Sequence, residues 1–369
     1  MQQSTIGKKE LIILLSAMLA INSFAIDITL PAMDFILKDF HINIANKQHY
    51  IITIYLFGYS IAQIIWGPVS DRFGRRTPLL LGLILYVVTS ILCIYTSSFF
   101  WFLFLRFWQG IGAAASRVLC NAIVRDLYGG EKMAQVLSIV TMIFMLAPIV
   151  APALGQLLLL KFAWRALFWF LSAGGLGVLL WIYFRLPETL KHSQSLRPAA
   201  LFSAFYQICT HRRAMAYSLI LSLLLGGLLA VVNTAKQVYA DVFGLGKLFP
   251  LAFAFIALCE SMSCFLNSAF IRHFGMYRVA RTALFVYAFA ALCMFGYTFT
   301  HGGSIPFFLY MALFATIMAA FGIIGPILNS LTMEDLGEVA GTASAFFGLQ
   351  QCLLGSLVGF IVAQQFNNT

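Results

Sequence analysis

Charged side chains are scarce in this chain of 369 residues: Asp, Glu, Lys and Arg together make up 10% of it. An ordinary soluble domain has roughly 25%. Hydrophobic residues make up 61%, which is more than one water-soluble core can hide, because a folded domain leaves much of its surface exposed. The composition therefore excludes a soluble enzyme, a nucleic-acid-binding domain and a disordered chain, and it indicates a membrane protein.

The sequence also lacks the motifs on which enzyme chemistry depends. It contains no pairing of a nucleophile with a base, no phosphate-binding Walker loop and no metal-ligand spacing. The seven cysteines include no pair with redox or metal-binding spacing. We therefore expect no enzyme, no metal and no cofactor. Without a nucleotide site, any driving force should be an ion gradient across the membrane.

Eleven apolar segments follow one another along the chain, each of about the 20 residues that a membrane-spanning helix needs. They lie at about 11–36, 48–70, 78–97, 99–122, 134–159, 164–186, 214–238, 248–271, 280–299, 304–331 and 341–366. The sequence therefore predicts an all-α polytopic membrane protein.

The one long polar interruption divides the chain into two parts. Residues 1–186 are predicted to form a six-helix half, 187–213 a cytoplasmic linker, and 214–369 a second half of five helices. With the N-terminus inside, fifteen Lys and Arg residues fall in inside loops and five in outside loops. Because basic residues favour cytoplasmic loops, we expect a cytoplasmic N-terminus.

The sharpest motif is the loop that follows the second segment, Gly67-Pro68-Val69-Ser70-Asp71-Arg72-Phe73-Gly74-Arg75-Arg76. Its glycines permit a tight turn and a close approach of helices, and an aspartate is favourable at the start of a facing helix. We expect a latch between two arrangements of the bundle, formed by Gly67, Asp71, Arg72, Gly74, Arg75 and Arg76 with Arg125 and Asp126. An ordinary basic inside loop would explain the arginines alone.

This loop resembles the signature of the major facilitator superfamily, G-x-x-x-D-R-x-G-R-R, at every fixed position. Residues 106–113 resemble the family's fourth-span motif and 27–32 its first-span motif. Residues 147–155 resemble the fifth-span motif of its drug/proton antiporters, with Ala147 in place of the usual first glycine. Residues 339–345 look like the Bcr/CflA multidrug branch, and 252–255 with 278–281 look most like the chloramphenicol/florfenicol exporters.

The resemblance implies a major facilitator fold of two six-helix halves and a proton-coupled antiporter that exports amphiphilic drugs across the bacterial inner membrane. The expected partners are a small drug, protons and the lipid bilayer, with no nucleic acid, and the chain should act as a monomer. The family has twelve spans, so the twelfth helix would be absent here. The alternatives are a proton-coupled carrier for a sugar or an amino acid, and a truncated homologue that does not transport.

The fifth-span motif is the main support for the hypothesis that the protein is an antiporter. Pro148 and Pro152 lie four residues apart, so both bend the same face of a helix. Ala147, Ala151 and Gly155 form a stripe of small residues that allows close packing on a neighbouring helix. The alternative is an ordinary kinked packing helix.

Ionisable residues inside the predicted spans are the candidates for proton and substrate chemistry: Asp27, Asp34, Arg106 and Glu260. Placing such a charged side chain at the centre of a membrane-spanning helix costs about 2.5–3.5 kcal/mol on insertion scales, so each needs a polar partner or a water-filled cavity. Asp27 is the first choice for proton exchange, with Arg106 as its electrostatic partner; the resemblance links the matching arginine to proton coupling. We expect Asp34 either near the outer mouth of the central cavity or at a helix end that is exposed to solvent. Glu260 is a second acid or a structural partner of a polar neighbour.

Uncharged polar residues also occur within the predicted spans: Tyr59, Gln63, Asn233 and Asn329. They could line a cavity, and hydrogen bonding between helices explains them equally well. The 36 Phe and 13 Met residues suit a pliable apolar pocket, since aromatic and thioether groups accept varied shapes.

Overall fold

The structure is a computed structural model and the protein is helical throughout the part that it describes. It describes residues 6–366 apart from 43, 129–135, 137–138, 141–142, 145, 191–205, 246–247, 335 and 337–339. Within these residues, each predicted apolar segment is occupied by a helix or by part of one.

The first half begins with α1 (Lys8–Asp27), which continues through a 3-10 turn, η1 (Leu30–Ala32), into the short α2 (Met33–Asp39). The turn occurs at Pro31, because proline cannot donate a backbone hydrogen bond within a helix. There follow η2 (Ala45–Gln48), α3 (His49–Phe73), α4 (Arg76–Tyr95), α5 (Phe99–Leu127), α7 (Ala147–Leu159) and α8 (Arg165–Arg185).

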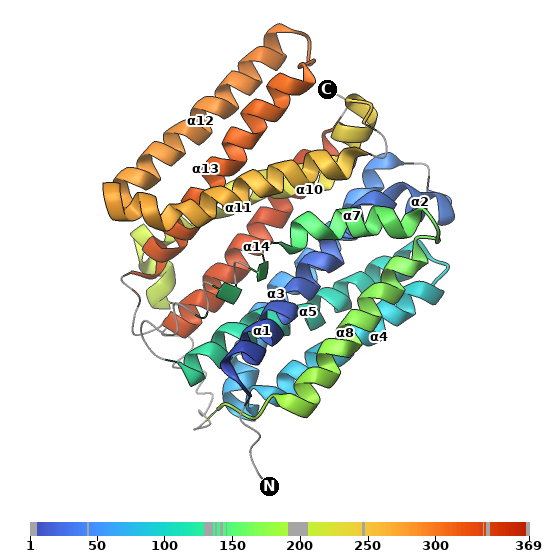
Figure 1. Ribbon diagram of the computed structural model, residues 1–369, viewed down its shortest axis with the longest axis vertical. Helices are drawn as coiled ribbons and strands as arrows, with labels where there is room; N and C mark the ends of the chain where they lie inside the picture. The colour runs from blue at the N-terminus through green and yellow to red at the C-terminus, as the bar shows by residue number, and fades with distance from the viewer. Residues whose placement is uncertain are drawn as a thin grey trace.

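The second half contains α10 (Arg212–Lys236), the π-helix η3 (Gln237–Val242), α11 (Phe249–Phe274), α12 (Met276–Thr300), α13 (Phe307–Met333) and α14 (Ala340–Gln364). In Figure 1, α4 and α8 lie at the lower right, and α12 and α13 lie side by side at the upper left. The linker boundaries at 187–213 stay a prediction, since most of the linker lies outside the described residues.

Helices pack mainly on others of their own half. In the first half, α5 lies against α3 and α4, and α4 lies against α8. In the second half, α10 packs on α14, and α13 packs on α11 and α12. The halves meet where α3 contacts α14, where α7 contacts α11, and where η1 contacts α10. A substrate path between the halves must therefore pass along these contacts.

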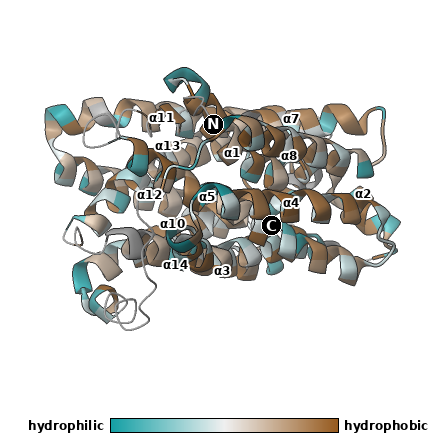
Figure 2. Ribbon diagram, turned by 90° about the horizontal axis from the view of Figure 1, so that it is seen from below, coloured by the Kyte–Doolittle hydropathy of each residue, from teal (hydrophilic) through white to brown (hydrophobic). Residues whose placement is uncertain are grey.

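Eight helices within the described residues are long and apolar enough to cross a membrane. Figure 2 shows hydrophobic residues along the helices and hydrophilic ones gathered mainly at helix ends and loops. Large apolar side chains such as Phe285, Phe299 and Phe308 are exposed on the outside of the bundle. This distribution suits a lipid solvent, in which exposed apolar side chains carry no penalty. The protein is a multi-pass membrane protein.

Candidate functional site

Asp27 is the last residue of α1 and its side chain is buried, with 6% of its surface exposed. Its Oδ2 accepts a hydrogen bond of 2.6 Å from the hydroxyl of Ser23, one helical turn earlier. Asp27 is not among the ion pairs of the described residues. A buried carboxyl group without a cation partner binds a proton more readily than an exposed one.

Arg106 of α5 is completely buried, and its guanidinium group joins three helices. Nη2 donates to the carbonyl oxygen of Ala25 in α1 at 3.0 Å, and Nε donates to that of Ile51 in α3 at 3.3 Å. Nη1 donates to Oε1 of Gln109 at 2.6 Å. Arg106 forms no direct ion pair with Asp27; it holds the backbone of α1 two residues before that carboxylate.

The surroundings of Arg106 extend this network. Gln109 Nε2 donates to the hydroxyl of Ser90 in α4 at 2.6 Å. The guanidinium carbon of Arg106 lies 4.6 Å from the centre of the Tyr55 ring, a favourable cation–π arrangement. The Tyr55 hydroxyl in turn donates to Asn22 of α1 at 3.1 Å. The first half therefore has a polar network that spans α1, α3, α4 and α5.

Glu260 of α11 is the acid that the second half contributes. The charge of Asp27 acts on Glu260 through space, and α11 contacts α7, which packs on α1. Its backbone oxygen accepts from the Ser263 hydroxyl at 2.8 Å. Asp34 lies in the first turn of α2, half-buried and beyond the 3-10 turn that follows α1.

The loop between α3 and α4 forms a polar cluster around Arg75, whose side chain is 3% exposed. Nη1 donates to Asp71 Oδ1 at 2.6 Å and to the Ser70 hydroxyl at 2.7 Å, and Nε donates to Asp126 Oδ2 at 2.7 Å. Burial by itself lowers the pKa of Arg75, but the hydrogen bonds to Asp126 and Asp71 outweigh it and raise the pKa above its ordinary value. The end of α3 is thereby tied to the end of α5.

Sequence reasoning missed one member of this cluster, Glu188, which follows α8. Its Oε1 accepts from the backbone N–H of Arg75 at 2.8 Å, and its Oε2 accepts from that of Arg76 at 3.1 Å. A carboxylate at the N-terminal end of α4 is also favoured by the helix dipole. Gly74, with φ of 89°, lies so close that a methyl group there would meet the carboxylate of Glu188. An acid that directly follows an apolar segment is the signal that could have identified it.

The other predicted latch residues are placed less centrally. The guanidinium of Arg76 contacts Tyr183 of α8, through its carbonyl oxygen and over its ring. Arg72 lies over the ring of Phe73, with 5.3 Å to its centre. Arg125 is exposed and is not among the ion pairs of the described residues. A methyl group at Gly67 would lie 4.0 Å from Val118, an ordinary contact. The structure therefore brings Asp71, Arg75 and Asp126 together and leaves Arg125 at the surface.

The small residues of α7 face the interior of the first half. Ala151 and Gly155 are buried, and a methyl group at Gly155 would lie 2.5 Å from the carbonyl oxygen of Ile28 and 3.0 Å from Pro31. The stripe therefore packs closely on the end of α1, near Asp27. Pro148 lies in the first turn of α7 and Pro152 lies inside the helix.

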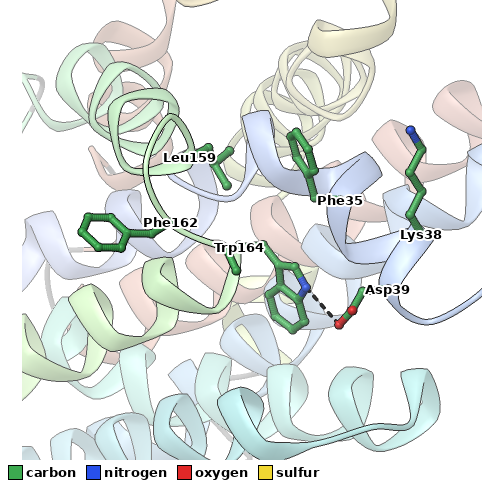
Figure 3. A pocket seen from close by; sticks show the side chains of 7 residues that line it. Phe35, Lys38, Asp39, Leu159, Phe162 and Trp164 are labelled. Atoms are coloured by element: carbon green, nitrogen blue, oxygen red, sulfur yellow. Dashed lines mark hydrogen bonds between the residues drawn. The ribbon is translucent and has the colours of Figure 1, made fainter.

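A pocket of about 450 Å³ lies between α2 and the connection from α7 to α8. Figure 3 shows the indole of Trp164 directed toward Asp39, with 3.1 Å from Nε1 to Oδ2. The remaining lining residues are Phe35, Lys38, Leu159, Phe162 and Ala163. None of the predicted site residues lines this pocket, so it is separate from the Asp27 region.

The uncharged polar candidates have different surroundings. Gln63 is buried beside Gly348 of α14, where a methyl group would lie 2.6 Å from Gln63 Oε1. Asn233 is buried with no hydrogen bond to its side chain within the described residues, and Asn329 is exposed. Gln63 and Asn233 thus lie inside the bundle, and Asn329 does not.

The sequence and the fold both match those of known membrane transporters. Residues 15–360 match the family model described as Major Facilitator Superfamily. The chain belongs to the major facilitator superfamily. It is similar to the D-xylose–proton symporter structure, with a TM-score of 0.74 and 16% identity over 96% of this chain and 89% of that one. The human organic anion transporter MFSD10 aligns with a TM-score of 0.67 and 19% identity, covering 98% and 95%.

Sequence relatives have higher identity. The chain is 30% identical to the bicyclomycin resistance protein homolog of Haemophilus influenzae, over 92% of this chain and 85% of the relative. It is 31% identical to the uncharacterized MFS-type transporter YdgK of Bacillus subtilis, over 96% and 89%. It is 32% identical to the multidrug resistance protein MdtL of Escherichia coli O157:H7, over 62% and 58%.

Proposed function

We propose that this protein is a proton-coupled antiporter that exports amphiphilic drugs, phenicols among them, across the bacterial cytoplasmic membrane. Relatives named for bicyclomycin and multidrug resistance support drug export. The resemblance of residues 252–255 and 278–281 supports the phenicol class. The Bcr/CflA assignment also belongs to this proposal, and its motif at 339–345 begins outside the described residues.

The observation that carries the proposal is the buried carboxyl group of Asp27, which accepts a hydrogen bond from Ser23 and forms no ion pair among the described residues. A carboxyl group away from water holds its proton more tightly, and water or a cation that reaches it promotes release. Relative motion of the halves changes the access of water to this region. Asp27 can then take up a proton in one arrangement and release it in the other.

Arg106 supports this exchange by position. Its hydrogen bond to Ala25 fixes the backbone two residues before Asp27. The ring of Tyr55 covers the guanidinium, and its hydroxyl binds Asn22 on the same helix. In the proposal, Arg106 keeps the end of α1 in register with α3 and α5 while Asp27 changes protonation state.

The test is drug-driven proton movement in vesicles that contain the full chain. Addition of chloramphenicol should release protons from the wild type, and Asp27→Asn should abolish the release, because an amide carries no exchangeable carboxyl proton. Glu10→Gln, at the other end of α1, is the matched control and should retain most of the signal, because Glu10 is an acid paired with Arg185. Unchanged proton release by Asp27→Asn would show that Asp27 is not the coupling group.

A further inference from the structure

Five buried polar side chains lie at the start of α3 and at the end of α10, two helices of opposite halves that contact each other. They form what we call the seam polar cluster, and each has at least one side-chain nitrogen or oxygen without a hydrogen bond of normal length and angle in the described residues. Each is at most 9% exposed. The members are Gln48, His49 and Thr53 of the first half and Asn233 and Gln237 of the second.

The cluster combines polar positions of two facing helices. His49 and Thr53 lie one turn apart at the start of α3, and Asn233 and Gln237 lie one turn apart where α10 passes into η3. The ring of His49 lies within hydrogen-bonding reach of the backbone of Asn233, although the geometry is outside normal length and angle. The cluster ends in a π-helix, a geometry that often occurs at functional sites.

The cluster lies next to a closure between the halves. Asn46 Nδ2 donates to the carbonyl oxygen of Gln364 at 3.0 Å, and Gln364 Nε2 donates to that of Asn46 at 2.8 Å. The ring of Tyr50 packs on Phe360 with 4.9 Å between centres. A substrate that leaves between the halves at this end must separate these contacts and pass the seam polar cluster.

Unpaired polar atoms in such a place require an explanation. Leaving a buried donor or acceptor unsatisfied costs about 1–3 kcal/mol, and lipid offers no replacement partner. Packing alone would favour apolar side chains here. Donors and acceptors lie on both halves at this contact. A ligand that carries complementary groups, and that moves between the halves, would explain them.

We propose that the seam polar cluster is a substrate subsite that binds the hydroxyl and amide groups of neutral amphiphiles. This inference rests on the proposed export function and specifies its substrate class. The five side chains offer amide, imidazole and hydroxyl groups, and none of them is a carboxylate. They suit uncharged hydrogen-bonding substrates and offer little to a lipophilic cation that has neither donors nor acceptors.

The experiment measures ligand binding to the full chain in phospholipid nanodiscs. The probes are chloramphenicol, a neutral molecule with hydroxyl and amide groups, and tetraphenylphosphonium, a cation without donors or acceptors. Asn233→Leu keeps side-chain size and removes the hydrogen-bonding groups. Asn267→Leu is the matched control: Asn267 of α11 is also a buried amide of the second half with an unpaired Oδ1, but its Nδ2 donates to the carbonyl oxygen of Ile323 in α13.

We expect Asn233→Leu to weaken chloramphenicol binding about tenfold, the effect of losing one or two hydrogen bonds, and to leave tetraphenylphosphonium binding unchanged. His49→Leu should show the same selectivity, and Asn267→Leu should lower affinity for neither probe. Thermal unfolding of each variant checks that the fold is retained, and a variant that unfolds is replaced by Asn233→Ser.

Three outcomes would overturn the inference: no chloramphenicol binding by the wild type, equal binding by wild type and Asn233→Leu, or an equal loss for both probes. Equal binding would mean that the cluster holds water only. Export from cells separates the two proposals. If the wild type exports chloramphenicol and Asn233→Leu does so normally, the subsite is wrong and the export function stands. If the wild type exports no drug, the export function is wrong, and selective binding would still support the subsite.

Discussion

The two halves of the molecule share a helical architecture but differ in how their polar groups are used. All four ion pairs of the described residues lie in the first half, joining Arg75 to Asp71 and Asp126, Arg165 to Asp39, and Arg185 to Glu10. The second half contributes Glu260, Asn233 and Gln237 at or near the seam. The first half therefore has ion pairs between its own helices. The second half instead has several polar groups at or near its contact with the first half.

The corresponding loops show this difference most directly. Gly74 after α3 and Gly275 after α11 both have positive φ, 89° and 80°. A methyl group at Gly74 would meet the carboxylate of Glu188, whereas one at Gly275 would find no atom within 4 Å. The similar turns thus differ in their surroundings: one is packed against a carboxylate and the other has free space beside it. The sequence of the turn alone therefore does not make a latch.

The largest effect should come from removing Arg106. Arg106→Met leaves Oε1 of Gln109 and the carbonyl oxygens of Ala25 and Ile51 without this donor, and it should lower the free energy of unfolding by about 3 kcal/mol. Thermal or denaturant unfolding in detergent measures the change. Arg117→Met is the control, since Arg117 lies on the same helix but is exposed. An equal fall in the free energy of unfolding for Asn267→Leu, in the second half, would contradict the proposal that internal polar contacts stabilise mainly the first half.

A smaller effect is expected at the clamped loop. Gly74→Ala adds a methyl group against Glu188 and strains a left-handed backbone. If the loop is a latch, drug turnover in proteoliposomes should fall about tenfold, equivalent to about 1.4 kcal/mol in the barrier, while drug binding persists.

Gly275→Ala is the matched comparison for this prediction. It has the same backbone strain but no collision, so turnover should stay within about twofold of the wild type. Equal slowing by both variants would assign the effect to backbone strain and remove the support for a latch at Gly74.

The smallest effect should come from the exposed ion pair between Glu10 and Arg185. Both nitrogen-to-oxygen hydrogen bonds are short, 2.7 and 2.6 Å, but the side chains are 26% and 45% exposed. Solvent and salt screen such pairs. Glu10→Gln should leave the unfolding midpoint unchanged at physiological salt and lower it slightly at low salt. A large fall at high salt would show that this pair braces the first half.

Part of the candidate site could be predicted from the sequence. The loop motif placed Asp71 and Arg75 together in the predicted latch, and in the structure these two residues form an ion pair. The position of Glu188 directly after an apolar segment marks it as a candidate, but its contact with Arg75 could not be predicted, because 113 positions separate the two residues. The expected pairing of Arg106 with Asp27 is replaced by backbone carbonyl oxygens and Gln109, since the rotation of α5 directs the guanidinium between α1 and α3.

The sequence by itself determined where the helices lie, because a bilayer requires about 20 apolar residues for each span and hydropathy is a local property. It also determined the family, through a loop motif in which every fixed position is matched. Only the tertiary structure decided which polar groups meet: Arg75 with Asp126 and Glu188, and Arg106 with the backbone of α1 and α3. These contacts join residues far apart in the chain, and they depend on how each helix is rotated and packed against its neighbours, which no local pattern of residues specifies.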